Sequence, residues 1–193
     1  MPERPSDPEE QYFKQREIEQ RQEMRERLSA QASELDKRRK IAADTGGTVE
    51  LAERIEGLGF NEDTAAVFDL LPVIWVAWAD GSVTGAERAA ILGMLDERHI
   101  KADTPAFKLV ETLLEEKPTP EYLEGALDVM RDLFQGKEVE SWNLIDMCAE
   151  VAQASGGFLG LFGDKVSKAE HDLIEKIASA LGKTAISALH EKL

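Results

Sequence analysis

Residues 70–87 read LLPVIWVAWADGSVTGAE, and the apolar run at the start of this segment decides the fold class. The run is apolar all round, which is typical of a helix at the centre of a core. Asp69 or Asp63 is the candidate N-cap of this helix, and Pro72 is tolerated in its first turn if Asp69 is the cap. The run is about half as long as a membrane-spanning helix requires. We therefore expect a buried central helix that ends near Ala79.

The rest of the chain also has the pattern of helices. Proline follows threonine at Pro105 and Pro120, a favourable way to begin a helix, and no run alternates with period two for long enough to form a strand. The sequence predicts an all-α fold: a compact bundle of about seven helices with an internal duplication of a helical hairpin, preceded by a long charged helix. We expect a charged helical N-terminal arm over residues 1–44 and a bundle domain over residues 45–193.

The arm has a composition typical of a solvent-exposed helix. It is rich in Glu, Gln, Arg, Lys and Ala, it has no Gly or Pro between Pro8 and Ala43, and opposite charges recur at helical spacing. Met24, Leu28 and Leu35 lie near one face, although the repeat of a coiled coil is not sustained. We expect this face to bind a protein partner, with homo-oligomerisation through the arm as a second use.

The motif that follows the central helix occurs twice. The letters VAWADG at residues 76–81 match VAQASG at residues 151–156 in four of six places. VTGAE at residues 83–87 matches VSKAE at residues 166–170 in three of five places, and the second copy has eight more residues between its halves. This pattern indicates that one helix–turn–helix unit has been used twice.

Both copies place Ser or Thr three residues before Glu at the start of an amphipathic helix. In such a capping box the hydroxyl of Thr84 or Ser167 accepts a hydrogen bond from the amide of Glu87 or Glu170. The Glu carboxylate in turn accepts from the amide of the cap residue. This interpretation explains both glutamates without a metal, and it is the one we favour.

The alternative interpretation is a divalent-cation site for Ca, Mg or Mn. An EF-hand loop ending at Glu87 is excluded, because two of its ligand positions fall on Val76 and Trp78, which offer no side-chain oxygen. A weaker site assembled from several helices stays open. Its candidate ligands are Asp80, Glu87, Asp164 and Glu170.

At these residues the chain resembles the TerB-like family, named for tellurite resistance, which also includes the N-terminal domain of DjlA-type co-chaperones. The likeness lies in the signature Ala-x-Ala-Asp-Gly-x-[Val/Ile]-x-x-x-Glu at residues 77–87 and a looser second copy at 166–181, and it covers about residues 60–181. The resemblance implies a non-enzymatic helical bundle linked to stress response, with acidic residues that bind metal. Carried over to this chain, those residues are Asp80, Glu87 and Glu170.

The charge distribution bears on the kind of partner. The chain has 23 Lys and Arg against 38 Asp and Glu, a net charge of −15. Residues 1–43 contain ten of each sign, so the whole excess falls on the remaining 150 residues. An acidic surface repels the phosphates of nucleic acids and attracts cations and basic protein surfaces. We therefore expect no nucleic-acid binding.

The glycine-rich segment at residues 156–163 reads GGFLGLFG and is a second candidate contact surface. Phe158, Leu161 and Phe162 would contact a protein partner or a membrane surface if they were exposed. The alternative is that they fold back onto the bundle, because soluble proteins seldom expose such a patch. We favour the second interpretation.

The sequence also indicates which classes of function are to be expected. No residues suggest a nucleophilic triad or a phosphate-binding loop, so we expect no enzymatic activity. The single Cys148 and the polar N-terminus favour a cytoplasmic protein. We expect an interaction or scaffold module of a cytoplasmic stress-response system. The alternative is a structural accessory subunit that docks on a larger assembly through its N-terminal helix.

Overall fold

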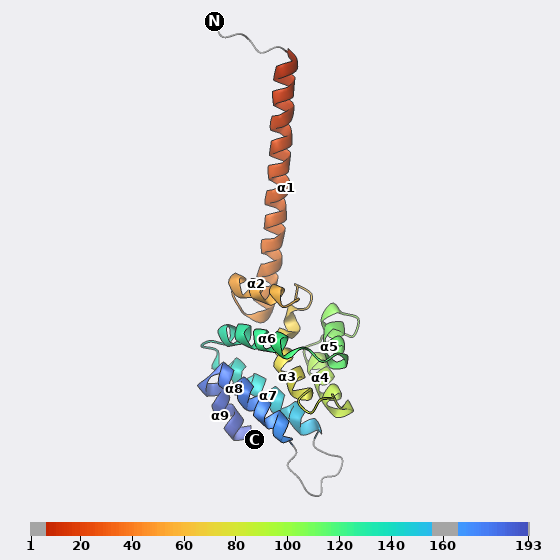
Figure 1. The fold of residues 1–193 in the computed structure, drawn as a ribbon, viewed down its shortest axis with the longest axis vertical. Helices are drawn as coiled ribbons and strands as arrows, with labels where there is room; N and C mark the ends of the chain where they lie inside the picture. Colours follow the sequence, from red (N-terminus) through yellow and green to blue (C-terminus); the bar gives the residue numbers. More distant parts are fainter. Residues whose placement is uncertain (1–6, 156–165, 193) are drawn as a thin grey trace.

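The computed structural model describes residues 7–155 and 166–192, and within these ranges all regular structure is helical. One long helix projects from a body of shorter ones (Figure 1). The predicted all-α bundle with a long N-terminal helix is therefore confirmed. After the arm helix, the described body contains eight α-helices and one 3-10 helix, where about seven were expected. The elements are α1 (Asp7–Thr45), α2 (Val49–Gly57), the 3-10 helix η1 (Ala65–Leu70), α3 (Leu71–Ala77), α4 (Gly85–Glu97), α5 (Pro105–Glu115), α6 (Pro120–Leu133), α7 (Glu138–Ser155), α8 (Lys168–Leu181) and α9 (Lys183–Lys192).

The apolar helix α3 lies at the centre of the body, as its sequence predicts. Leu71, Val73, Ile74 and Val76 are all buried, and the helix packs against α7, α6 and α8. No helix within the described ranges combines the length and the apolar character needed to cross a membrane.

The start of the central helix differs from the prediction. Residues Ala65–Leu70 form a 3-10 helix, and α3 begins only at Leu71. Pro72 has no N–H to donate to the carbonyl four residues earlier, so a regular α-helix cannot run through this point from the preceding segment. Neither aspartate expected as a cap serves as one, and Asp69 instead pairs with Arg98.

A second central helix, α7, packs against α9, α3, α4 and α8. Its buried face includes Leu144, Ile145 and Cys148. Burial raises the pKa of the Cys148 thiol far above its ordinary value, so the side chain behaves as a small apolar residue. The two helices that precede the repeated motif, α3 and α7, thus pack against each other in one core.

The last turns of α1 belong to the body. Ile41 is completely buried and Ala42 nearly so, although both lie within the segment expected to form the separate arm. Just before them, Arg38 forms ion pairs with Glu53 and Glu56 of α2. The packed body therefore begins inside the long helix, a few residues before the boundary expected at residue 44.

Candidate functional site

The turn between α3 and α4 sets the geometry of the first motif copy. Gly81 has a φ of +92°, a conformation that side chains other than glycine rarely adopt. Thr84 is the N-cap of α4, and its hydroxyl accepts from the Glu87 amide at 3.2 Å. The Glu87 carboxylate accepts from the Thr84 amide at 2.6 Å, which completes a capping box.

The second motif copy has the same local geometry at the start of α8. The Ser167 hydroxyl accepts from the Glu170 amide at 3.2 Å, and the Glu170 carboxylate accepts from the Ser167 amide at 2.6 Å. Both glutamates therefore satisfy backbone donors that a helix N-terminus otherwise leaves without partners.

The two capping boxes meet in space. The Ser167 hydroxyl, besides accepting from Glu170, donates to the carboxylate of Asp80 at 2.9 Å. Glu87 and Glu170 are 3% and 1% exposed, unusual for side chains that commonly lie on the surface. The structure thus brings together Asp80, Glu87 and Glu170, which lie up to 90 positions apart in the sequence.

Burial and charge act on Glu87 in the same direction. Burial raises the pKa of its carboxyl above the ordinary value, the hydrogen bonds from Thr84 lower it, and the charges of Glu170 and Asp80 raise it further. The net pKa shift is upward. A cation placed among these carboxylates would relieve the repulsion, because an opposite charge favours the ionised form.

The expected metal ligands are not packed as tightly as those of a formed metal centre. Within the described ranges, the group of three or more potential ligands whose atoms all lie within 4.8 Å of one another is His171, Asp172 and Glu175. Asp80, Glu87 and Glu170 do not reach that distance. Asp164, the fourth expected ligand, lies outside the described residues.

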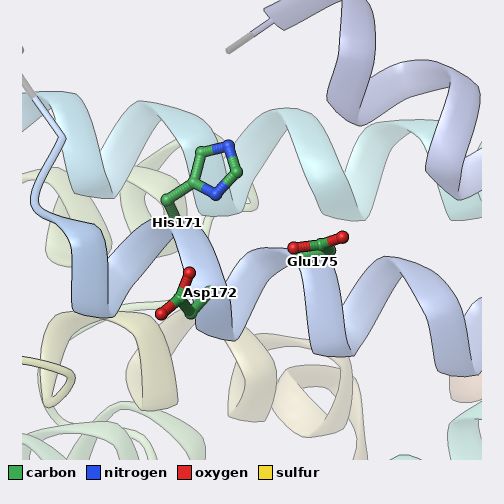
Figure 2. Close-up of side chains that lie close together, drawn as sticks. All are labelled: His171, Asp172 and Glu175. Carbon is green, nitrogen blue, oxygen red and sulfur yellow. The ribbon is translucent and has the colours of Figure 1, made fainter.

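The closer group is exposed and comes from a single helix. Figure 2 shows His171 and Asp172 projecting from α8 in different directions, with Glu175 about one turn further along. This group was not predicted from the sequence, although the spacing of four residues between His171 and Glu175 places both on one face of a helix. Exposed acidic groups of this kind are common without any ion, and the group offers no ligand from a second element.

A cavity of about 350 Å³ lies at the base of the arm. Asp44 and Thr45 at the end of α1 form one wall, and the ion pair between Asp69 and Arg98 forms part of another. The Arg98 guanidinium donates to both Asp69 oxygens, at 2.7 and 2.8 Å, and so joins the end of α4 to η1. This pair has no local signal in the sequence, because its members lie 29 positions apart.

The candidate partner-binding residues fall into two groups. On the arm, Met24 and Leu28 are each 57% exposed and Leu35 is 40% exposed. The other three, Phe158, Leu161 and Phe162, lie outside the described residues. The arm is thus the candidate binding surface that can be described in structural terms.

The two tryptophans of the central helix lie at the edge of the core. The indole N–H of Trp78 donates to the Leu113 carbonyl at 2.9 Å, and the Lys176 ammonium lies 4.8 Å from the centre of the Trp75 ring. Both side chains are half-buried against the core, which fits a packing role.

Comparisons of the chain with protein-family models, with curated proteins and with solved structures gave no match.

Proposed function

We propose that the chain is a non-enzymatic interaction module of TerB-like type, which engages a protein partner through its N-terminal helix. The observation that carries the proposal is the exposure of α1. Residues 10–36 of this helix are exposed throughout. Six large apolar side chains in this stretch are exposed to solvent: Tyr12, Phe13, Ile18, Met24, Leu28 and Leu35. A stretch of helix that buries no apolar side chain in its own chain is suited to contact another protein.

The resemblance at residues 77–87 adds a cellular setting to this proposal: a cytoplasmic stress-response system of the tellurite-resistance type. The alternative within the same proposal is an accessory subunit that decorates a larger assembly. Both versions place the partner on the arm, so one truncation tests them together.

The truncation begins at Asp36, so that the buried Ile41 and the pairs of Arg38 remain. We expect the chain over residues 36–193 to fold with a melting temperature close to that of the full chain. It should lose the partner that the full chain captures from extracts of its own cells, as measured by quantitative mass spectrometry. Equal capture by both chains would exclude the arm as the binding element.

A second part of the proposal concerns the junction of the two capping boxes. We propose that Asp80, Glu87 and Glu170 bind a divalent cation such as Ca, Mg or Mn. The support is the convergence of three carboxylates, two of them buried. At a concentration about 100 times the dissociation constant, a cation stabilises the folded chain by about 2.7 kcal/mol. For a chain of this size, that corresponds to a rise in melting temperature of roughly 5–10 °C.

The test compares melting temperatures in EDTA and in millimolar Ca, Mg or Mn. Any cation screens the charge of an acidic chain, so the EDTA sample receives NaCl to the same ionic strength. We expect Asp80→Asn to abolish the selective shift and His171→Ala, in the exposed group on α8, to leave it intact. A shift lost only in His171→Ala would assign the ion to α8 instead. No selective shift with any of the three ions would leave the two boxes as helix caps.

A further inference from the structure

We infer that a second copy of this chain occupies the arm, and that the two arms pair antiparallel with Met24 at the centre of the contact. The inference rests on the proposed role of α1 as a binding surface. Phe13, Met24 and Leu35 recur every eleven residues, which is about three helical turns, so they lie on one line along the arm. Leu28 lies beside this line. We call Phe13, Met24, Leu28 and Leu35 the arm stripe; its members are 40–65% exposed.

Three members of the arm stripe, Phe13, Met24 and Leu35, are symmetric about Met24, whereas Leu28 meets Gln20 of the other copy. Phe13 and Leu35 each lie eleven positions from Met24. In an antiparallel pair centred on Met24, Phe13 of each copy therefore meets Leu35 of the other, and Met24 meets itself. A twofold axis at this point makes the contact closed and isologous, as in most homodimers.

Charges along the arm are complementary in the same register. On the exposed part of the arm, opposite charges meet in two kinds of pair, Lys14 with Glu34 and Glu23 with Arg25, and each pair occurs twice because of the twofold axis. One kind of like-charge pair, Arg21 with Arg27, opposes them. Glu10 lies opposite Arg38, but Arg38 already pairs with Glu53 and Glu56 of α2.

A parallel pair fits these residues less well. Glu17 lies within the angular range of the arm stripe, and a parallel pair in register would place it against its own copy. In the antiparallel pair centred on Met24, the same carboxylate meets the amide of Gln31, which can donate to it. The carboxylate of Glu17 thus favours the antiparallel orientation, whereas Leu28, which would meet its own copy in a parallel pair, does not.

The net charge of the bodies does not oppose this arrangement. The arm is neutral, with ten charges of each sign over residues 1–43, whereas each body carries the net charge of −15. Antiparallel pairing places the two bodies at opposite ends of a contact about 42 Å long. At physiological salt, charge interactions between exposed groups are screened beyond about 8 Å. The bodies therefore do not oppose association of the arms.

The first test is sedimentation equilibrium of the full chain. We expect a species of twice the chain mass of 21.4 kDa. Met24→Glu places two carboxylates against each other at the centre and should give a monomer. Ile18→Glu is a matched control, because Ile18 is 63% exposed and lies off the arm stripe; this variant should remain a dimer. A wild-type monomer at 100 µM, or equal loss of the dimer in both variants, would overturn the inference.

The second test reads the register by disulfide formation, in a chain whose native Cys148 is buried and does not compete. Met24→Cys should form a covalent dimer under mild oxidation. Leu28→Cys should not, because its two copies would lie about 12 Å apart along the axis, beyond the roughly 7 Å limit for a disulfide. Cross-linking in both variants would indicate a parallel pair and contradict the inference.

Failure of this inference is distinguishable from failure of the proposed function. A monomeric full chain that still captures a partner through residues 7–35 would exclude the homodimer and leave the interaction module standing. A dimer with the predicted cross-linking pattern, in a chain that captures no other protein, would identify the second copy as the partner itself.

Discussion

Glu87 is subject to two opposing effects, a favourable one from its hydrogen bonds and an unfavourable one from the burial of its charge. Because its pKa is raised in the folded chain, the folded state takes up a proton more readily than the unfolded state does. The contribution of this group to stability therefore falls as pH rises from the ordinary pKa near 4.5 through the raised value. Glu87→Gln keeps an oxygen acceptor for the Thr84 amide and removes the charge.

We expect Glu87→Gln to match or exceed the wild-type melting temperature at pH 7, with the difference shrinking as pH approaches 4.5. Thermal melts at several pH values measure this. Glu87→Ala separates the two effects, because it removes the acceptor as well as the charge and should destabilise by about 0.5–2 kcal/mol. A Glu87→Gln variant less stable than wild type at pH 7, with a gap that widens at lower pH, would contradict the assignment.

His99 is held in a left-handed conformation, with a φ of +59°. It follows the last turn of α4, where its amide donates to the Asp96 carbonyl and the Ile100 amide donates to the Leu95 carbonyl. These two bonds define a Schellman motif, in which glycine is the preferred residue. We expect His99→Gly to raise stability by about 1 kcal/mol, measured by urea unfolding, because the strain of a left-handed side chain is removed. His99→Ala is the control and should give no such gain.

The long helix α1 contains two isoleucines in opposite environments. Ile41 is completely buried at the base, whereas Ile18 is 63% exposed on the free part. We expect Ile41→Ala to destabilise the chain by about 2–5 kcal/mol, because it leaves a cavity in the core. Ile18→Ala should change stability by less than about 0.5 kcal/mol. Urea unfolding of both variants measures the difference, and equal effects would mean that the helix is not anchored at its base.

The helices whose signals are local could be predicted from the sequence. The apolar run predicted the central position of α3, and the Ser/Thr-x-x-Glu pattern predicted where α4 and α8 begin. What could not be predicted depends on contacts between distant segments. Asp69 is a plausible cap by its neighbours alone, yet it pairs with Arg98, and the hydrogen bond from Ser167 to Asp80 joins residues 87 positions apart.

The buried end of α1 was missed for a related reason. Its sequence has no sustained apolar repeat, so nothing in the periodicity separates Ile41 from the exposed apolar residues before it. Packing against α2 and η1 distinguishes the last turns from the rest of the arm. A boundary set by composition, at residue 44, therefore falls after the first buried residues of the body.

The charge of the molecule as a whole opposes its compact state. With a net charge of −15, confined to the residues after the arm, the body repels itself. Raising NaCl from about 10 mM to 150 mM shortens the screening length from about 30 Å to 8 Å. We expect the melting temperature at pH 7 to rise over this range. Near pH 4.7, the isoelectric point, the effect should be much smaller.

A melting temperature that falls with added salt at pH 7 would reverse this interpretation. It would mean that ion pairs such as Arg98 with Asp69 and Arg38 with Glu56 stabilise the body by more than the excess charge destabilises it. The same titration provides the ionic-strength baseline for the divalent-cation melts.

Because α1 is one continuous helix from its exposed end to its buried base, a change of angle at the base moves the whole helix. Asp44 and Thr45, at the fixed end, also line the cavity beside the Asp69–Arg98 pair. Thirty residues of helix extend about 45 Å, so a tilt of only about 10° at the base would carry the far end through about 8 Å. Small rearrangements of a few side chains around this cavity would thus be amplified into a large displacement at the tip, and a probe attached near Tyr12 would detect them.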